Sequence, residues 1–160
     1  MSKGVSDPKV LQCFVSALKE AFYIQLGLNL EITSIHMKSK SSAAIITGAT
    51  VEFSDSVRHG RIRMLFSEAC LSHLFERMAG AMDSSSPEER TQAAAEMLNI
   101  FYASARKYLN EAGFEFPLAI PVSIPLISEA LIEPWPQSVT MHCHTLIGDF
   151  VTEITLAQAG

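Results

Sequence analysis

Apolar residues recur at helical spacing in three stretches of this chain, and the stretches are bounded by residues typical of helix ends. The first stretch follows Asp7 and Pro8, an N-cap residue and a proline suited to the first helical position, and stops at Gly27. A shorter stretch follows Ser67 and stops at Gly80. The pattern predicts a long helix and a short helix in the first half of the chain.

The third helical stretch has the strongest local signal. Ser86-Pro87-Glu88-Glu89 reads as a capping box, with proline in the first turn and acidic side chains at the positive end of the helix dipole. Helical spacing then continues to Gly113, over about 26 residues or roughly 39 Å. The sequence therefore predicts two principal helices with a shorter one between them.

Short runs rich in β-branched residues lie between and after these helices. The segment Ser54–Gly60 is a plausible hairpin connection between two runs, and the last run folds back near Gly148 and Asp149, a common turn pair. The predicted strands are Leu30–Met37, Ala43–Phe53, Arg61–Phe66, Leu118–Ile124, Ser128–Ile132 and Val139–Leu156.

The order of these elements, helix then strands and again helix then strands, indicates an α+β fold built from two pseudo-repeated halves. Long helices would pack on an antiparallel or mixed sheet. The length suits one domain over residues 1–160, with residues 1–6 as a flexible N-terminus.

Composition narrows the classes of function. Lys and Arg total 12 against 17 Asp and Glu, a formal net charge of −5, and the closest basic group, Arg58, Arg61 and Arg63, lies beside a predicted turn. Nucleic-acid binding is therefore excluded, because it needs clustered cations on one face. Apolar residues make up 48% and charged residues only 18%, which suggests that a partner or a second copy covers part of the surface.

No segment has the unbroken apolar run of a membrane span, because prolines interrupt the most apolar stretch, Phe116–Ile132. The N-terminus lacks the apolar core of a secretory signal. Cys13, Cys70 and Cys143 are odd in number and widely spaced, which disfavours a disulfide framework. We expect a reduced, cytoplasmic protein.

The long third helix has two different faces. Glu96 and Asn99 are three positions apart and stand side by side outside the apolar stripe. The same face continues through Gln92 before them and through Ala103 and Arg106 after them, and small residues such as Ala95 would let another protein approach closely. The apolar stripe consists of Ala94, Leu98, Phe101, Ala105, Tyr108 and Leu109.

Spacing alone leaves two interpretations of this face open. An exposed Glu and Asn are usually a solvated helix surface, and Glu-x-x-Asn arises often by chance. What favours a functional role is that the residues around the pair resemble those of a known family.

The chain resembles the CheX members of the CheC/CheX/FliY family, phosphatases of the chemotaxis response regulator CheY. That family carries Glu-x-x-Asn on a long helix, with a small residue four positions after the asparagine, and Glu96, Asn99 and Ala103 match this motif. Order and spacing agree over roughly residues 30 to 157. The other matching segments are Gly60–Phe66, Leu74–Gly80, Leu109–Gly113 and the proline-bearing strand that follows.

Three positions depart from the family pattern. Gln92 stands where many relatives have Ser or Asp, and Ala103 stands in place of the frequent glycine. The proline after the motif helix, Pro121 or Pro125, does not have the family's spacing.

The resemblance implies one phosphatase site per chain, since Glu20 of the first helix is followed at the third position by Tyr23. Asn99 would orient the attacking water, and Glu96 would pair with the lysine in the regulator's active site. Gln92, Ala95, Ala103 and Arg106 would contact the regulator. The resemblance also implies a CheC-like fold, a homodimer joined across sheet edges, no cofactor or metal of its own, and Mg²⁺ held by the partner.

The chemistry of the amide fits this role independently of the resemblance. Hydrolysis of an aspartyl phosphate depends on positioning water and stabilising charge. The oxygen of Asn99 can accept a hydrogen bond from water, its NH₂ group can donate one, and the neutral amide does not repel the phosphoryl group.

Other candidate sites have weaker support. In His142-Cys143-His144 on a strand, the histidines face one side and the cysteine the other, which is not a zinc site without further ligands. Cys70 and His73 lie about one helical turn apart and read as a partly buried cysteine and an ordinary helix histidine. The remaining candidates read as structural: His36 and His59 as strand and turn residues, and Trp135 as a strand-end anchor.

Two alternatives to the phosphatase remain open. One is a noncatalytic module of the same fold that binds a receiver domain or a flagellar-switch component. The departure from the family pattern at Gln92 leaves this alternative open. The other is a structural dimer without a signalling role. Whichever function holds, long strands such as Val139–Ile147 carry edges and faces that a second copy could cover.

Overall fold

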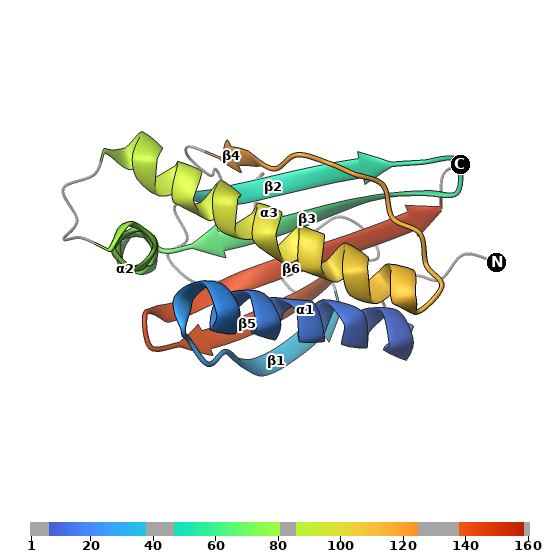
Figure 1. Cartoon of the computed structure of the whole chain (residues 1–160), viewed down its shortest axis with the longest axis horizontal. Coiled ribbons are helices and arrows are strands. Elements are labelled where there is room, and N and C mark those ends of the chain that lie inside the picture. Colours follow the sequence, from blue (N-terminus) through green and yellow to red (C-terminus); the bar gives the residue numbers. More distant parts are fainter. Residues whose placement is uncertain (1–6, 38–46, 81–85, 125–137, 159–160) are drawn as a thin grey trace.

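The structure is a computed structural model that describes residues 7–37, 47–80, 86–124 and 138–158 (Figure 1). Three helices and six strands form in these residues. In chain order they are α1 (Pro8–Leu26), β1 (Glu31–Met37), β2 (Thr47–Ser54), β3 (Arg58–Phe66), α2 (Glu68–Ala79), α3 (Pro87–Glu111), β4 (Val122–Ile124), β5 (Ser138–Thr145) and β6 (Gly148–Gln158).

Each helix begins and ends at the residues that the sequence indicates. The Asp7 carboxylate accepts a hydrogen bond from the backbone N–H of Lys9 at 2.8 Å at the start of α1. Gly27 and Gly80 end α1 and α2 with φ near +67° and +68°, a conformation in which glycine is the least strained residue. The capping box predicted at Ser86 and Glu89 is present at the start of α3.

The six strands form one antiparallel sheet with the order β1-β5-β6-β3-β2-β4. The strand order is symmetric between the two halves of the chain, in which β1, β2 and β3 correspond to β4, β5 and β6. Exchanging each strand with its counterpart gives the same order, read from the other edge of the sheet. The first strand of each half thus pairs with a strand of the other half, β1 with β5 and β4 with β2. This symmetry agrees with the predicted pseudo-repeat.

Two predicted strand boundaries were wrong, and the first is the start of β3, which lies at Arg58 instead of Arg61. Only Val122–Ile124 of the segment 118–124 is a strand. The second is the start of β4, because the residues before Val122 lie against α3. There the hydroxyl of Tyr102 donates to the carbonyl of Pro117 at 2.7 Å. The predicted fold-back near Gly148 is confirmed, since the turn between β5 and β6 lies at residues 146–147 and Gly148 begins β6. The predicted strand 128–132 and residues 43–46 lie outside the described residues.

The predicted exposed edge at residues 139–147 was also wrong. Strand β5 lies inside the sheet, between β1 and β6. The outer strands of the described sheet are β1 and β4.

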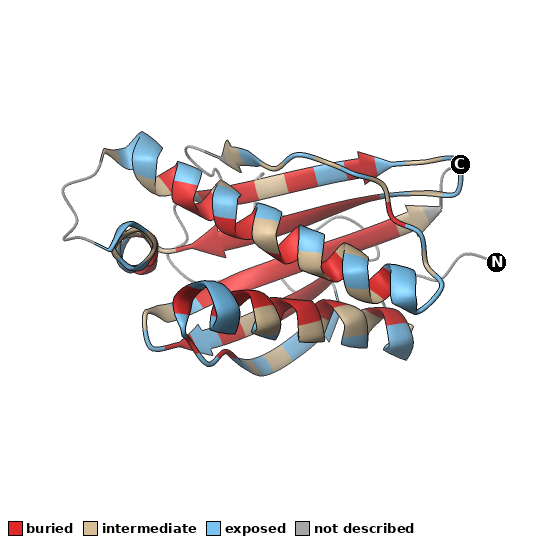
Figure 2. Ribbon diagram, in the orientation of Figure 1, coloured by how far each residue is buried: buried red, intermediate tan, exposed pale blue. Residues whose placement is uncertain are grey.

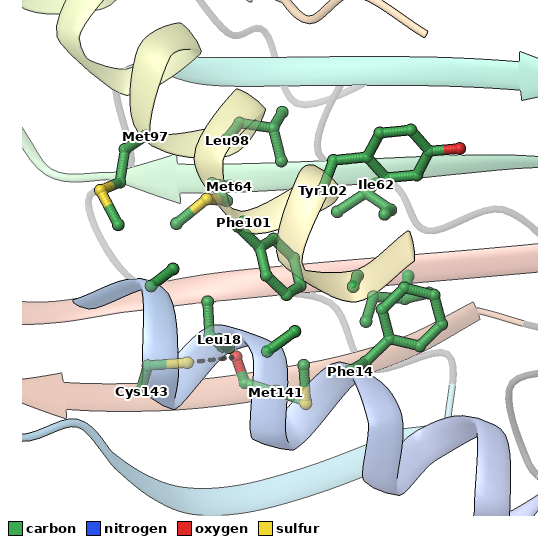
Figure 3. Close-up of a cluster of buried hydrophobic side chains, with 14 of the residues drawn as sticks. Phe14, Leu18, Ile62, Met64, Met97, Leu98, Phe101, Tyr102, Met141 and Cys143 are labelled. Carbon is green, nitrogen blue, oxygen red and sulfur yellow. Dashed lines mark hydrogen bonds between the residues drawn. The ribbon is translucent and has the colours of Figure 1, made fainter. Parts of the chain in front are cut away.

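Helices α1 and α3 lie on one face of the sheet, and α2 is seen end-on next to the end of β3 (Figure 1). The exposed residues of α1 and α3 point away from the sheet (Figure 2). Helices α1 and α3 lie side by side and run in opposite directions over the central strands (Figure 1). Their side chains meet those of β3 and β5 in one apolar core (Figure 3). The labelled members of this core are Phe14, Leu18, Ile62, Met64, Met97, Leu98, Phe101, Tyr102, Met141 and Cys143. Much of the apolar content therefore belongs to the chain's own core.

The other face of the sheet carries buried charges. Arg61 and Arg63 of β3 both pair with the Glu153 carboxylate of β6, at 3.0 and 2.8 Å. Two members of the basic group noted in the sequence, Arg61 and Arg63, are thus buried and paired. Among the described residues, no helix is long and apolar enough to span a membrane.

Candidate functional site

Helix α3 presents Glu96 and Asn99 to solvent from turns that are anchored in the core. Both side chains are exposed, whereas Met97 and Leu98 between them have no accessible surface. The two exposed residues are three positions apart and thus about 4.5 Å apart along the helix axis. The packing of Met97 and Leu98 fixes the helix, so the pair stands at a defined place on a rigid element.

Neither exposed side chain is engaged by another residue in the described part of the chain. Glu96 and Asn99 make no side-chain hydrogen bond or ion pair with any residue that the structure describes. A carboxylate and an amide without internal partners can bind groups of another molecule. The arrangement suits recognition of a cation and a hydrogen-bonding group side by side.

The neighbouring positions differ in how open they are. Gln92 and Ala103 are exposed, and Ala95 is half-buried. Arg106 is half-buried as well, and its Nε donates to the carbonyl of Phe116 at 3.0 Å. The predicted polar face of α3, from Gln92 to Arg106, therefore exists, and we call it the polar stripe. Part of the Arg106 guanidinium on this stripe is already bound by the carbonyl of Phe116.

The segment after α3 borders the polar stripe on one side. The buried hydroxyl of Tyr102 donates to Pro117, and the hydroxyl of Ser123 donates to the carbonyl of Thr91 at 3.2 Å. Burial raises the pKa of Tyr102, so its hydroxyl stays protonated and remains a donor. These bonds hold the segment 114–124 against α3.

A groove borders the polar stripe on the other side, between α2 and α3, with a volume of about 230 Å³. Phe75, Met78 and Ala79 line it from α2, while Gln92 and Glu96 line it from α3. The sequence did not single out the α2 residues, because apolar residues at helical spacing read as core. Only the relative placement of the two helices leaves them at a surface.

The histidine and cysteine candidates do not form a metal centre. Cys143 lies in the core, where its thiol donates to the carbonyl of Met141 at 3.7 Å, and burial raises its pKa to about 12. Nδ1 of His144 contacts the Asp149 carboxylate at 2.5 Å on the opposite face. Within the described ranges, no three His, Cys, Asp or Glu side chains are arranged to hold a metal ion.

The Cys70 and His73 pair shows no sign of catalysis. Cys70 is buried, and desolvation raises its pKa to about 12, so the thiolate that nucleophilic attack needs is scarce. His73 is exposed and lies 3.5 Å from Glu76 of its own helix. His36 and His59 lie in β1 and β3, and Trp135 is outside the described residues.

Comparison with protein families identifies the chain. A family model described as the chemotaxis phosphatase CheX matches residues 47–130, more than half of the 160 residues and all of α3. The chain belongs to the CheX family. No curated protein sequence matches it significantly.

Solved structures similar to this CheX-family chain share its fold. The chemotaxis protein CheX from Vibrio vulnificus has a TM-score of 0.78 and 20% identity, covering 92% of this chain and 99% of that one. A CheC-like superfamily protein from Shewanella sp. PV-4 has a TM-score of 0.78 and 19% identity, covering 94% and 99%. CheX from Borrelia burgdorferi, in a complex with CheY, BeF₃ and Mg²⁺, has a TM-score of 0.65 and 16% identity, covering 94% and 98%. The predicted CheC-like α+β fold is confirmed.

Proposed function

We propose that this CheX-family chain hydrolyses the aspartyl phosphate of a CheY-like chemotaxis response regulator. The observation that carries the proposal is the exposed pair Glu96 and Asn99, which has no partner among the described residues and stands on a core-anchored helix. The family match and the complex of Borrelia burgdorferi CheX with CheY support the choice of partner.

Asn99 orients the attacking water in this proposal. Hydrolysis needs a water in line with the phosphorus and the departing carboxylate, so holding that water lowers the barrier mainly by positioning. The Asn99 oxygen accepts a hydrogen bond from the water, and the amide group brings no negative charge near the phosphoryl oxygens. The packing of Met97 and Leu98 in the core holds the helix in place, and the helix holds the Asn99 amide in place.

Glu96 anchors the regulator by pairing with the lysine of its active site. The carboxylate stands one turn before Asn99 on the same exposed face. An ion pair at this point fixes the regulator's position relative to the Asn99 amide. Gln92, Ala95, Ala103 and Arg106 form the surrounding contact surface, with small side chains near the amide to allow close approach.

The divalent cation belongs to the regulator. Mg²⁺ neutralises the developing charge on the phosphoryl group, and acidic oxygen ligands of the receiver are suited to hold it. The Borrelia burgdorferi complex contains Mg²⁺ together with CheY and BeF₃. This chain thus contributes two side chains to an active site that the substrate protein otherwise supplies.

The chain is further proposed to form a homodimer by pairing sheet edges, in a cytoplasmic setting. Of the two outer strands of the described sheet, β1 has seven residues and β4 has three, and Ile35 and Met37 on β1 are substantially exposed. Cys13, Cys70 and Cys143 are free thiols, which suits a reducing compartment. Size-exclusion chromatography at micromolar concentration should give a dimer, and a 17.5 kDa species would count against it.

The function is tested by phosphate release from a phosphorylated CheY-like receiver domain with and without this chain. The proposal predicts catalytic acceleration by the unmodified chain and nearly complete loss in the Asn99→Ala variant. Binding of the phosphorylated receiver without faster release would favour the noncatalytic module instead.

A further inference from the structure

The groove between α2 and α3 has walls of two different kinds. Phe75, Met78 and Ala79 of α2 give it an apolar wall. The α3 wall carries Glu89 and Glu96 at its two ends with Gln92 between them. Positions 89, 92 and 96 follow helical spacing, so their side chains form one row along α3.

The charge of the groove is entirely acidic among the residues that line it. Two carboxylates and a neutral amide face it, and no Lys, Arg or His takes part in its described lining. Glu96 makes no hydrogen bond or ion pair within the described chain. The groove thus offers acceptors without a cation of its own to satisfy them.

Glu89 is held in position by the capping box. Its Oε1 accepts hydrogen bonds from the backbone N–H and the hydroxyl of Ser86, each at 3.2 Å. Its Oε2 has no such partner among the described residues. A fixed carboxylate binds a cation at a smaller entropic cost than a mobile one, because less rotamer freedom is lost.

We infer that this groove binds a long basic side chain, Lys or Arg, on the surface of the response regulator, separate from the lysine that pairs with Glu96. The methylene chain lies against Phe75 and Met78, and the cationic head reaches Glu89 and Gln92. Lys and Arg combine these two properties, an apolar stem and a charged head. The inference rests on the proposed function, because the groove ends at Glu96 and is continuous with the proposed contact surface.

The groove would select among receiver domains. Every receiver that is a substrate offers a phosphorylated aspartate and a lysine at its active site, so Glu96 and Asn99 alone cannot distinguish one regulator from another. A basic side chain at a fixed distance from that site adds a second requirement. The groove is therefore a specificity determinant that acts on affinity.

The test measures the affinity of the full chain for a receiver domain carrying BeF₃ and Mg²⁺, using Glu89→Gln and Met78→Gln. Glutamine at position 89 removes the charge and keeps the capping box. Glu88→Gln is the matched control, since it removes the same charge from the same helix turn, and Glu88 is exposed and does not line the groove. Circular dichroism and thermal unfolding verify that each variant is folded.

The expected result is a dissociation constant about threefold to fivefold higher for Glu89→Gln and Met78→Gln, with Glu88→Gln close to the unmodified chain. The effect of Glu89→Gln should shrink as salt concentration rises, because a partly exposed ion pair is screened. The rate of phosphate release at saturating receiver should stay the same in both groove variants, since neither removes Glu96 or Asn99.

Equal affinities for groove and control variants would overturn the inference while leaving the phosphatase proposal intact. A loss of equal size in Glu88→Gln would also overturn it, because the effect would then be one of general charge. If the groove variants altered self-association instead, the groove would belong to a second copy. An unmodified chain that binds the receiver but does not hydrolyse it would refute the phosphatase proposal alone, and the affinity comparison would still decide the groove.

Discussion

Glu20 of α1 and Ser104 of α3 share a hydrogen bond of 2.5 Å, in which the serine hydroxyl donates to the glutamate Oε2. Oε1 accepts from the hydroxyl of Tyr108 at 3.4 Å and lies 3.6 Å from the Lys107 ammonium. This cluster joins the two principal helices on the side that does not face the sheet. The carboxylate of α1 is thus engaged internally, whereas Glu96 has no partner among the described residues. This contrast favours the expectation of one site per chain.

Replacing Glu20 by Gln should make stability depend less on pH. The hydrogen bond from Ser104, and then the charge of Lys107, lower the pKa of Glu20 in the folded protein. A depressed pKa contributes stability above the ordinary value of about 4.3, and that contribution is lost as pH falls through the folded-state pKa. Because the cluster is partly exposed and screened by solvent, Glu20→Gln should cost less than about 1 kcal/mol in free energy of unfolding at neutral pH.

The measurement is urea unfolding of the unmodified chain and the variant at neutral pH and below about pH 4. The difference between them should shrink at the lower pH. Glu115→Gln, at an exposed position outside the helices, serves as control. A difference that stays constant with pH would show that the Glu20 charge does not stabilise the fold.

Among the charged residues of the sheet, Glu153 is the one whose replacement we expect to lower the free energy of unfolding most. Glu153→Ala leaves the buried guanidinium groups of Arg61 and Arg63 without their shared carboxylate. Removing one partner of a buried ion pair typically costs about 3–5 kcal/mol. Glu31→Ala, at an exposed position on the outer strand β1, should change the free energy of unfolding much less. Similar losses in the two variants would contradict a stabilising role for the buried cluster.

The sequence predicts helices well because their ends are determined locally. Asp7, Ser67 and Ser86 bind backbone N–H groups within their own first turns, so neighbouring residues suffice to place them. The apolar stripe of α3 was also predicted from local spacing alone. Tyr108 of this stripe is only half-buried, because its hydroxyl reaches toward Glu20.

The strands and ion clusters were harder to predict because they depend on distant partners. The residues before β4 lie against α3, where Tyr102 bonds Pro117, a residue 15 positions away. Arg63 and Glu153 are 90 positions apart and meet only because β3 and β6 pair. Glu96 and Asn99 could be selected by spacing and family resemblance, whereas the groove beside them required the placement of α2 against α3.

Replacing Glu96 by Gln should separate docking from chemistry. The variant keeps the size of the side chain and removes the charge that pairs with the regulator's lysine. Affinity for the receiver carrying BeF₃ and Mg²⁺ should fall about tenfold, because a charge-assisted contact is lost. Isothermal titration calorimetry can measure this, with Glu111→Gln near the end of the same helix as control. Unchanged affinity in Glu96→Gln would remove the anchoring role.

The central claim is that Asn99 positions the attacking water, and a single-turnover assay of phosphate release from the phosphorylated receiver tests it most directly. At saturating enzyme, Asn99→Ala and Asn99→Asp should each lower the rate by about a hundredfold or more, because the first removes the water-binding amide and the second adds a repelling charge. Asn29→Asp, at an exposed position before β1, controls for the added charge and should keep full activity. Rates within about twofold of the unmodified chain in Asn99→Ala would contradict the account.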